Sequence, residues 1–109
     1  MSTAPARRRE TIAPGRVDTR PRLLFFFSPT SGPSRRAEGF LAQVLQRRGN
    51  HSSFRLARID VDQRPDLVER LRVTEIPTLL VVADGRVRER VVRPSGCAEI
   101  SKKLAPWLR

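Results

Sequence analysis

The sequence predicts one α/β domain in which helices flank a central mixed sheet of about four strands. A short, unbroken apolar run at Leu23–Phe27 is typical of a strand that is buried on both faces. Apolar residues with helical spacing follow it, and the turn signal Asp84-Gly85 separates two β-branched segments, as in an antiparallel hairpin. A chain of 109 residues is long enough for one domain with a single modest core.

The N-terminal segment has a different composition. Residues 1–21 are rich in Pro, Arg, Ala and Thr and have no helical or alternating periodicity, so we expect a disordered or loosely attached basic extension. Ile12–Val17 supplies a short edge strand at most. The folded domain is then residues 22–109. Neither a signal peptide nor a membrane span is indicated, and the single cysteine fits a reducing compartment, so we expect a cytoplasmic location and no contact with a membrane.

The first strand is expected to end at Ser28-Pro29, before a long amphipathic helix. From Arg35 the apolar residues follow the i, i+3, i+4, i+7 spacing until the stop signal Gly49-Asn50; they are Ala37, Phe40, Leu41, Val44 and Leu45. Either Ser31 or Ser34 can cap the start of this helix, because a serine hydroxyl accepts a hydrogen bond from a free backbone amide of the first turn.

The middle of the chain predicts a second central strand at Phe54–Val61 and a short helix from Pro65 to about Leu71, because the fixed φ of proline suits the first helical position. This β-α-β order implies a parallel pair joined by a right-handed crossover.

The last third predicts a hairpin and a helix. Thr78–Val82 and Arg86–Val92 are β-branched segments on either side of Asp84-Gly85 and should pair antiparallel. Gly96, with Glu99 three residues later, starts a final helix that Pro106 ends or kinks.

The charge is strongly basic, with a net value of +11 from 22 Lys and Arg residues against 11 Asp and Glu. Such a chain attracts polyanions, and one hypothesis is a basic nucleic-acid-associated protein that uses Arg7, Arg8, Arg9 and the arginines of the predicted helices. Aromatic residues do not alternate with the arginines to form a base-stacking surface, and a uniform arginine bias has an equally simple compositional origin. Nucleic acid is therefore the less favoured partner.

Four local motifs occur in one order along the chain. Ser31-Gly32-Pro33-Ser34 has the frame of Cys-Gly-Pro-Cys, and it is followed by Ile59–Gln63 (Ile-Asp-Val-Asp-Gln), Ile76–Leu79 (Ile-Pro-Thr-Leu) and Asp84-Gly85. In this order and spacing the chain from Arg22 to Leu108 resembles the thioredoxin family. The resemblance implies a thioredoxin-like fold for the ordered domain.

The same resemblance implies a degenerate active site. Ser31 and Ser34 occupy the positions of the two cysteines, and thiol-disulfide exchange needs one thiolate to attack and a second thiol to resolve. Thr30 replaces the family's tryptophan, Phe25 its buried aspartate, and Arg93 a small glycine that borders its substrate groove. We therefore expect a thioredoxin-like protein that is inactive as a dithiol-disulfide oxidoreductase.

A peptide-binding role is what the resemblance leaves intact. It implies that Pro77 is cis and that the Ile76 backbone lies beside the 31–34 turn, where the family pairs with an extended polypeptide by strand addition. We expect a protein or peptide partner at this Ser31/Pro77 surface, held by Thr30, Gly32, Pro33, Thr74, Ile76, Pro77 and Arg93. The alternative is that Pro77 is only an inherited structural element.

Cys97 carries the enzymatic alternative, a monothiol oxidoreductase or redox sensor in cell redox homeostasis. It is expected in the first turn of the last helix, where backbone amides stabilise a thiolate, although a lone cysteine is more often a small buried residue. His51 should lie a full helix away from Ser31 and Ser34, so a Ser-His pair is not expected. One Cys and one His do not form a metal cluster, and we expect no metal and no cofactor.

Overall fold

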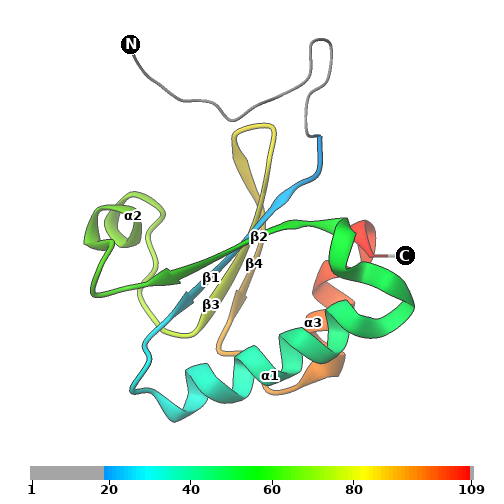
Figure 1. The fold of residues 1–109 in the computed structure, drawn as a ribbon. Coiled ribbons are helices and arrows are strands. Elements are labelled where there is room, and N and C mark those ends of the chain that lie inside the picture. The colour runs from blue at the N-terminus through cyan, green and yellow to red at the C-terminus, as the bar shows by residue number, and fades with distance from the viewer. Residues whose placement is uncertain (1–18, 109) are drawn as a thin grey trace, which may run out of the picture.

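The computed structural model describes residues 19–108. These residues form a four-stranded mixed sheet with helices on both faces (Figure 1). The strand order is β2-β1-β3-β4, with β1 parallel to β2 and antiparallel to β3, and β3 antiparallel to β4. The elements are β1 (Arg22–Phe27), α1 (Gly32–Gln46), the 3₁₀ helix η1 (Arg47–Ser53), β2 (Arg55–Asp60), α2 (Pro65–Arg70), β3 (Thr78–Ala83), β4 (Arg86–Val92), α3 (Cys97–Leu104) and the 3₁₀ helix η2 (Ala105–Trp107). The predicted fold class is confirmed.

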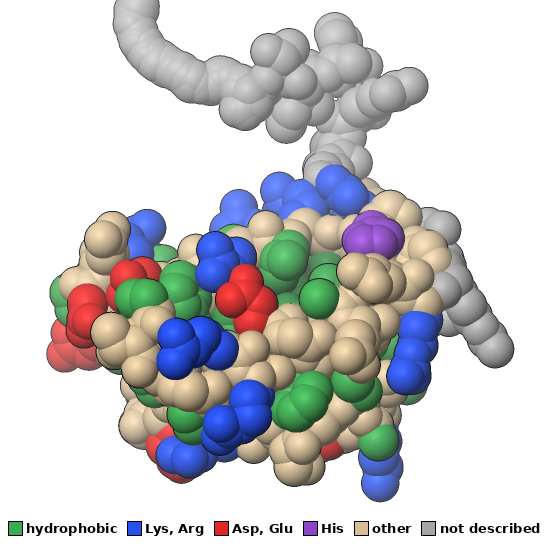
Figure 2. Space-filling view, turned by 60° about the horizontal axis from the view of Figure 1, so that its bottom comes forward, with side chains coloured by type: hydrophobic (Ala, Val, Ile, Leu, Met, Phe, Trp, Pro, Cys, Tyr) green, Lys and Arg blue, Asp and Glu red, His purple; other side chains and the backbone are tan. Residues whose placement is uncertain are grey.

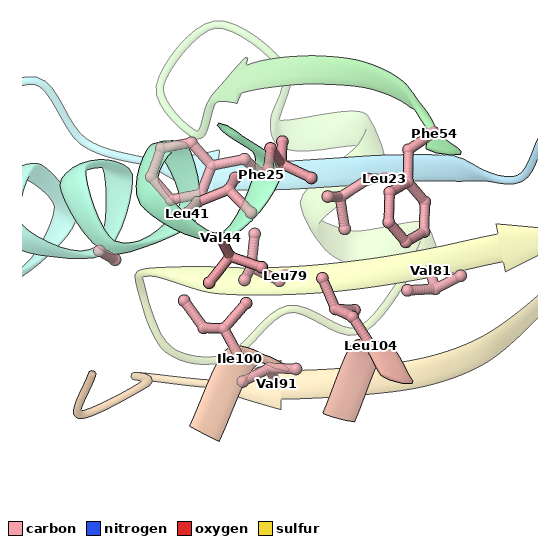
Figure 3. Packing of buried hydrophobic residues seen from close by; sticks show 12 residues of the cluster. Leu23, Phe25, Leu41, Val44, Phe54, Leu79, Val81, Val91, Ile100 and Leu104 are labelled. Atoms are coloured by element: carbon pink, nitrogen blue, oxygen red, sulfur yellow. The ribbon is translucent and has the colours of Figure 1, made fainter. Parts of the chain in front are cut away.

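Strand β1 lies inside the sheet and contributes to two cores. Because side chains alternate along a strand, Leu23 and Phe25 face α1 and α3, whereas Leu24 and Phe26 face α2. Figure 3 shows the first cluster, in which side chains from α1, α3 and three strands interdigitate. Its buried members are Leu23, Phe25, Ala37, Leu41, Val44, Leu45, Phe54, Leu79, Val81, Val91, Ile100 and Leu104. The prediction that this apolar strand is buried on both faces is confirmed.

Helix α1 begins three residues before the predicted start at Arg35. Ser31 is its N-cap, and Gly32 and Pro33 occupy the first turn, where proline's missing N–H costs nothing. Apolar periodicity could not indicate this turn, because its residues carry no apolar side chain that marks a face. The helix ends at Gln46, and the chain continues as η1 through Gly49, whose φ of 68° favours glycine.

The predicted parallel pair and hairpin are both present. Strand β2 is one residue shorter at each end than predicted, and Phe54 is instead buried beside Trp107, with ring centroids 6.5 Å apart. The hairpin turn has positive φ at both Asp84 (55°) and Gly85 (75°), as a two-residue turn that matches strand twist requires.

Helix α3 ends at Leu104, and Pro106 lies in η2, so proline ends the α-helix as predicted. At the other end of α3, Glu99 Oε1 accepts hydrogen bonds from the backbone N–H (2.9 Å) and hydroxyl (3.1 Å) of Ser95, which extends the predicted Gly96/Glu99 start by one residue. No helix in residues 19–108 is both long and apolar enough to span a membrane. The expected edge strand at Ile12–Val17 and most of the expected N-terminal extension lie outside the described residues.

Candidate functional site

The turn between β1 and α1 is held by its two serine hydroxyls. Ser31 Oγ accepts a hydrogen bond from the Ser34 backbone N–H at 3.2 Å and caps α1. Ser34 Oγ accepts one from the Ser28 backbone N–H at 3.1 Å, and the Ser34 residue is only 2% exposed. The hydroxyls of both serines, which the resemblance places at two cysteine positions, therefore serve as structural acceptors in the turn.

Pro77 lies at the start of β3. The Ile76–Pro77 peptide bond is cis, and the proline is fully buried. The Pro77 carbonyl accepts a hydrogen bond from the Arg93 backbone N–H at 2.8 Å, and Thr78 Oγ1 donates to the Glu75 carbonyl at 2.6 Å. The chain after β4 is thereby fixed against the loop before β3.

A small cavity of about 280 Å³ opens between the turn, the Pro77 loop and the start of α3. Its lining, which we call the Pro77 groove, is Pro33, Arg36, Phe40, Pro77, Arg93, Pro94 and Ser95. Figure 2 brings the α1 end of the molecule forward and shows basic side chains next to hydrophobic ones on this face. Three separate parts of the chain form the Pro77 groove, namely α1, Pro77 and the segment 93–95, so the fold has to be complete for it to exist.

Three of the seven predicted peptide-binding residues come together in this groove: Pro33, Pro77 and Arg93. The other four lie outside its lining: Thr30 is exposed, with its hydroxyl 3.1 Å from that of Ser28, Gly32 is half-buried in the first turn of α1, Thr74 is exposed, and Ile76 packs against the core on the α2 side.

Sequence reasoning missed Arg36, Phe40, Pro94 and Ser95. Helical spacing from Gly32 through Arg36 to Phe40 would have indicated the first two.

The position of the expected buried acid is filled by aromatic packing. Phe25 is 1% exposed and stacks on Phe27 with ring centroids 5.6 Å apart. The guanidinium of Arg58 lies 4.6 Å from the Phe27 ring centroid and forms an ion pair of 2.7 Å with Glu38 of α1. No titratable group therefore lies at position 25.

Cys97 is half-buried against α1 and not against the turn. Its S–H has two acceptors within reach, Gln43 Oε1 at 3.1 Å and the Phe40 carbonyl at 3.6 Å, and the closer one is the glutamine oxygen. Phe40 lies six residues beyond Ser34, which corresponds to about 9 Å along the helix axis. The thiol thus adjoins one end of the Pro77 groove, which Phe40 lines.

Two acidic residues, Asp60 at the end of β2 and Asp66 in α2, have local hydrogen-bond partners. Asp60 Oδ1 accepts from the Asp62 backbone N–H at 2.9 Å, and Arg64 donates to both oxygens of Asp66 at 3.0 and 3.1 Å. The hydrogen bond from Arg64 lowers the pKa of Asp66 from 3.8 to about 2. Within residues 19–108 no group of His, Cys, Asp and Glu side chains could hold a metal ion.

A larger cavity of about 610 Å³ lies on the α2 side of the sheet and includes none of the predicted site residues. Two of its arginines, Arg58 and Arg64, are already paired with Glu38 and Asp66. We therefore assign the candidate site to the smaller Pro77 groove.

Comparison with known proteins places this architecture in one family. The thioredoxin family model matches residues 10–106, which is most of the chain. The chain belongs to the thioredoxin family. This thioredoxin-family protein is 28% identical to the thioredoxin of Mycobacterium tuberculosis over 86 residues, covering 79% of this chain and 72% of that protein. It is 34% identical to the thioredoxin of Bacillus subtilis over 70 residues, covering 64% and 65%.

Solved thioredoxin structures share the fold of this family member. The germline-specific thioredoxin Deadhead of Drosophila melanogaster superposes with a TM-score of 0.72 at 22% identity over 84% of each chain. Trxlp of Edwardsiella tarda gives a TM-score of 0.70 at 16% identity, also over 84% of each chain. At these identities the likeness shows the fold alone.

Proposed function

We propose that this thioredoxin-family protein binds an extended segment of a partner protein in the Pro77 groove and does not catalyse dithiol-disulfide exchange. The proposal depends on one observation, which is that an open groove lies beside two serine hydroxyls that are already used to build the turn. The groove is open to solvent and formed by three parts of the chain, while Ser31 and Ser34 are both engaged in hydrogen bonds that build the turn.

Loss of the dithiol reaction follows from the chemistry of the side chains. Exchange needs a thiolate that attacks and a second thiol that resolves the mixed disulfide, and the chain has one cysteine. A serine nucleophile would need a base, but His51 is exposed in η1, beyond the far end of the 15-residue helix α1. That helix separates His51 from Ser31 by about 22 Å. At this distance His51 cannot act as a base for Ser31.

Peptide binding needs none of the missing groups. An extended segment can be held by main-chain hydrogen bonds while small pockets select its side chains. A volume of about 280 Å³ is at the lower limit of ligand pockets, so the Pro77 groove suits one or two side chains of a polypeptide better than a whole cofactor. A reducing compartment fits the single cysteine, so the proposal includes a cytoplasmic location.

The test compares proteins captured from extract of the native cells by the intact chain and by variants of the groove. Pro77→Ala alters the buried floor of the groove, and Ser95→Trp fills it from an exposed position that is outside the core. Ser52→Trp, at an exposed position in η1, is the matched control. Circular dichroism confirms that each variant is folded.

We expect partners that are retained by the intact chain and by Ser52→Trp but lost with Ser95→Trp and Pro77→Ala. A set of partners that is the same for all four folded proteins would overturn the peptide-binding proposal.

The alternative function is monothiol chemistry at Cys97. Its support is that the thiol is half-buried and adjoins the groove at Phe40. Reduction of insulin in the presence of dithiothreitol distinguishes the two functions. Our proposal expects no turnover above the rate with dithiothreitol alone, whereas turnover that disappears in Cys97→Ser would establish the alternative.

A further inference from the structure

Two cationic side chains of the Pro77 groove have no partner within residues 19–108. Arg36 and Arg93 are exposed, and neither guanidinium forms an ion pair or hydrogen bond with residues 19–108; none of the seven lining residues is acidic. We propose that the groove selects acidic segments, in which Asp or Glu side chains bind these two arginines. The inference rests on the proposed function and adds the class of peptide.

Arg36 is held over the turn by helix geometry. It lies four residues after Gly32 on α1, and a Cβ built on Gly32 would be 3.5 Å from Arg36 Nη1. This is ordinary van der Waals distance, so the guanidinium lies directly against the first turn of the helix. A planar guanidinium matches the two oxygens of a carboxylate with parallel hydrogen bonds.

Arg93 is held beside Pro77 by its backbone. Its N–H donates to the Pro77 carbonyl at 2.8 Å, and its φ is 49°, a left-handed conformation that glycine adopts more easily than arginine. An arginine therefore stands where glycine would be less strained. A residue that is held in a strained backbone conformation is a candidate for a functional role.

Three arginines outside the groove form ion pairs within residues 19–108. Arg58 pairs with Glu38 at 2.7 Å, Arg64 with Asp66 at 3.0 Å and Arg88 with Asp84 at 3.4 Å. Glu99 does contact the lining of the groove, but both of its hydrogen bonds go to Ser95. Among the lining residues of the groove, Arg36 and Arg93 are the two that carry positive charge, and neither forms an ion pair within residues 19–108.

The shape of the groove favours a polypeptide over a nucleic acid. Its lining includes three prolines and one aromatic residue, Phe40, which is half-buried against the core, so the groove lacks the series of exposed aromatic rings on which bases stack. A small apolar floor with two guanidinium groups suits an apolar side chain next to a carboxylate. The occupant we commit to is therefore an acidic, extended segment of a partner protein.

The first stage of the test selects displayed random heptapeptides on the immobilised full chain and on Ser95→Trp. We expect sequences enriched in Asp and Glu that are recovered only on the intact chain. Recovery of no groove-dependent sequence would contradict the proposed function and this inference together. Groove-dependent sequences without an excess of Asp and Glu would overturn this inference alone.

The second stage measures the dissociation constant of one selected peptide, labelled with fluorescein, by anisotropy. Arg36→Gln and Arg93→Gly should each raise the dissociation constant about fivefold, the effect of losing one exposed ion pair. The controls are Arg35→Gln, a neighbour outside the groove, and Arg72→Gly, which also removes an exposed arginine with a left-handed φ (57°). Both controls should leave the constant within about twofold.

Equal affinity of the groove variants and their controls would overturn the inference. Displacement of the peptide by short single-stranded DNA, with DNA binding lost in Arg36→Gln and Arg93→Gly but kept in the controls, would also overturn it, because the groove would then be a nucleic-acid site.

Discussion

Replacing Ser34 by alanine removes the hydroxyl that accepts a hydrogen bond from the Ser28 backbone N–H at 3.1 Å. Ser34 is 2% exposed, so water has little access to take the place of its hydroxyl. An unsatisfied, partly buried donor costs about 1–2 kcal/mol. Ser31→Ala removes the N-cap of α1, which costs about 1 kcal/mol.

The two losses act on different hydrogen bonds of one turn. Ser31 Oγ bonds the backbone of residue 34 and not its side chain, so Ser34→Ala leaves the cap in place. The sum of the two losses is about 2–3 kcal/mol, and because neighbouring residues couple, the double variant is expected to depart from that sum by about 0.5 kcal/mol or more. For a domain of this size each kcal/mol lowers the melting temperature by about 4–8 °C. Ser34→Ala alone should therefore lower it by roughly 5–15 °C.

The assay is thermal and urea unfolding followed by circular dichroism. Thr30→Ala is the control, because the Thr30 hydroxyl contacts that of Ser28 only at the surface and its loss should cost less than about 0.5 kcal/mol. If both serine variants unfold like Thr30→Ala, the hydroxyls do not build the turn, and the interpretation of this site as a structural turn is refuted.

Three further perturbations test the core, the charges and the backbone. Phe25→Asp should destabilise the domain by more than about 4 kcal/mol in urea unfolding, because it removes a buried ring and buries a carboxylate. Asp66 should titrate near pH 2 by NMR, and Arg64→Gln should raise its pKa toward 3.8; because the folded-state pKa is depressed, the stabilisation by this pair is present above about pH 4 and is lost as the pH falls toward 2. Gly85→Ala (φ 75°) should destabilise by about 1 kcal/mol, whereas Gly39→Ala, in α1 with no atom within 4 Å of an added Cβ, should stabilise by about 0.5–1 kcal/mol in thermal unfolding.

Each of these has a clear contrary result. A Phe25→Asp protein with unchanged stability would show that the site tolerates a charge. An Asp66 pKa that does not respond to Arg64→Gln would remove the ion pair as the cause of the shift. Equal stability changes at Gly85 and Gly39 would show that backbone conformation does not decide the effect.

The strands and the hairpin could be predicted because their signals are local. Leu23–Phe27 is apolar throughout, and Asp84-Gly85 has the positive φ values that its sequence favours. The start of α1 could not be placed by apolar spacing, because Ser31 and Pro33 act through a hydroxyl cap and a fixed φ. Likewise, Phe54 is buried through a contact with Trp107, more than fifty residues away, and not through strand pairing.

The site was predictable only as far as the family motifs extend. Pro33, Pro77 and Arg93 came from the resemblance and do meet in one groove. Arg36 and Ser95 belong to it because α1 and the loop before α3 converge there, which depends on tertiary packing. The left-handed backbone at Arg93 also has no signal in the sequence, since arginine does not favour that conformation.

The strand order of the sheet places several arginines on its two outer strands, which affects how two copies of the protein can associate. In the described sheet the two outer strands are β2 and β4, which carry Arg55 and Arg58, and Arg86, Arg88 and Arg90, while the inner strand β3 has no charged residue. A strand at the border of a sheet is a template for intermolecular pairing, and long cations along it oppose the approach of a second copy. The arginines of β2 and β4 thus disfavour edge-to-edge pairing of two copies of this protein.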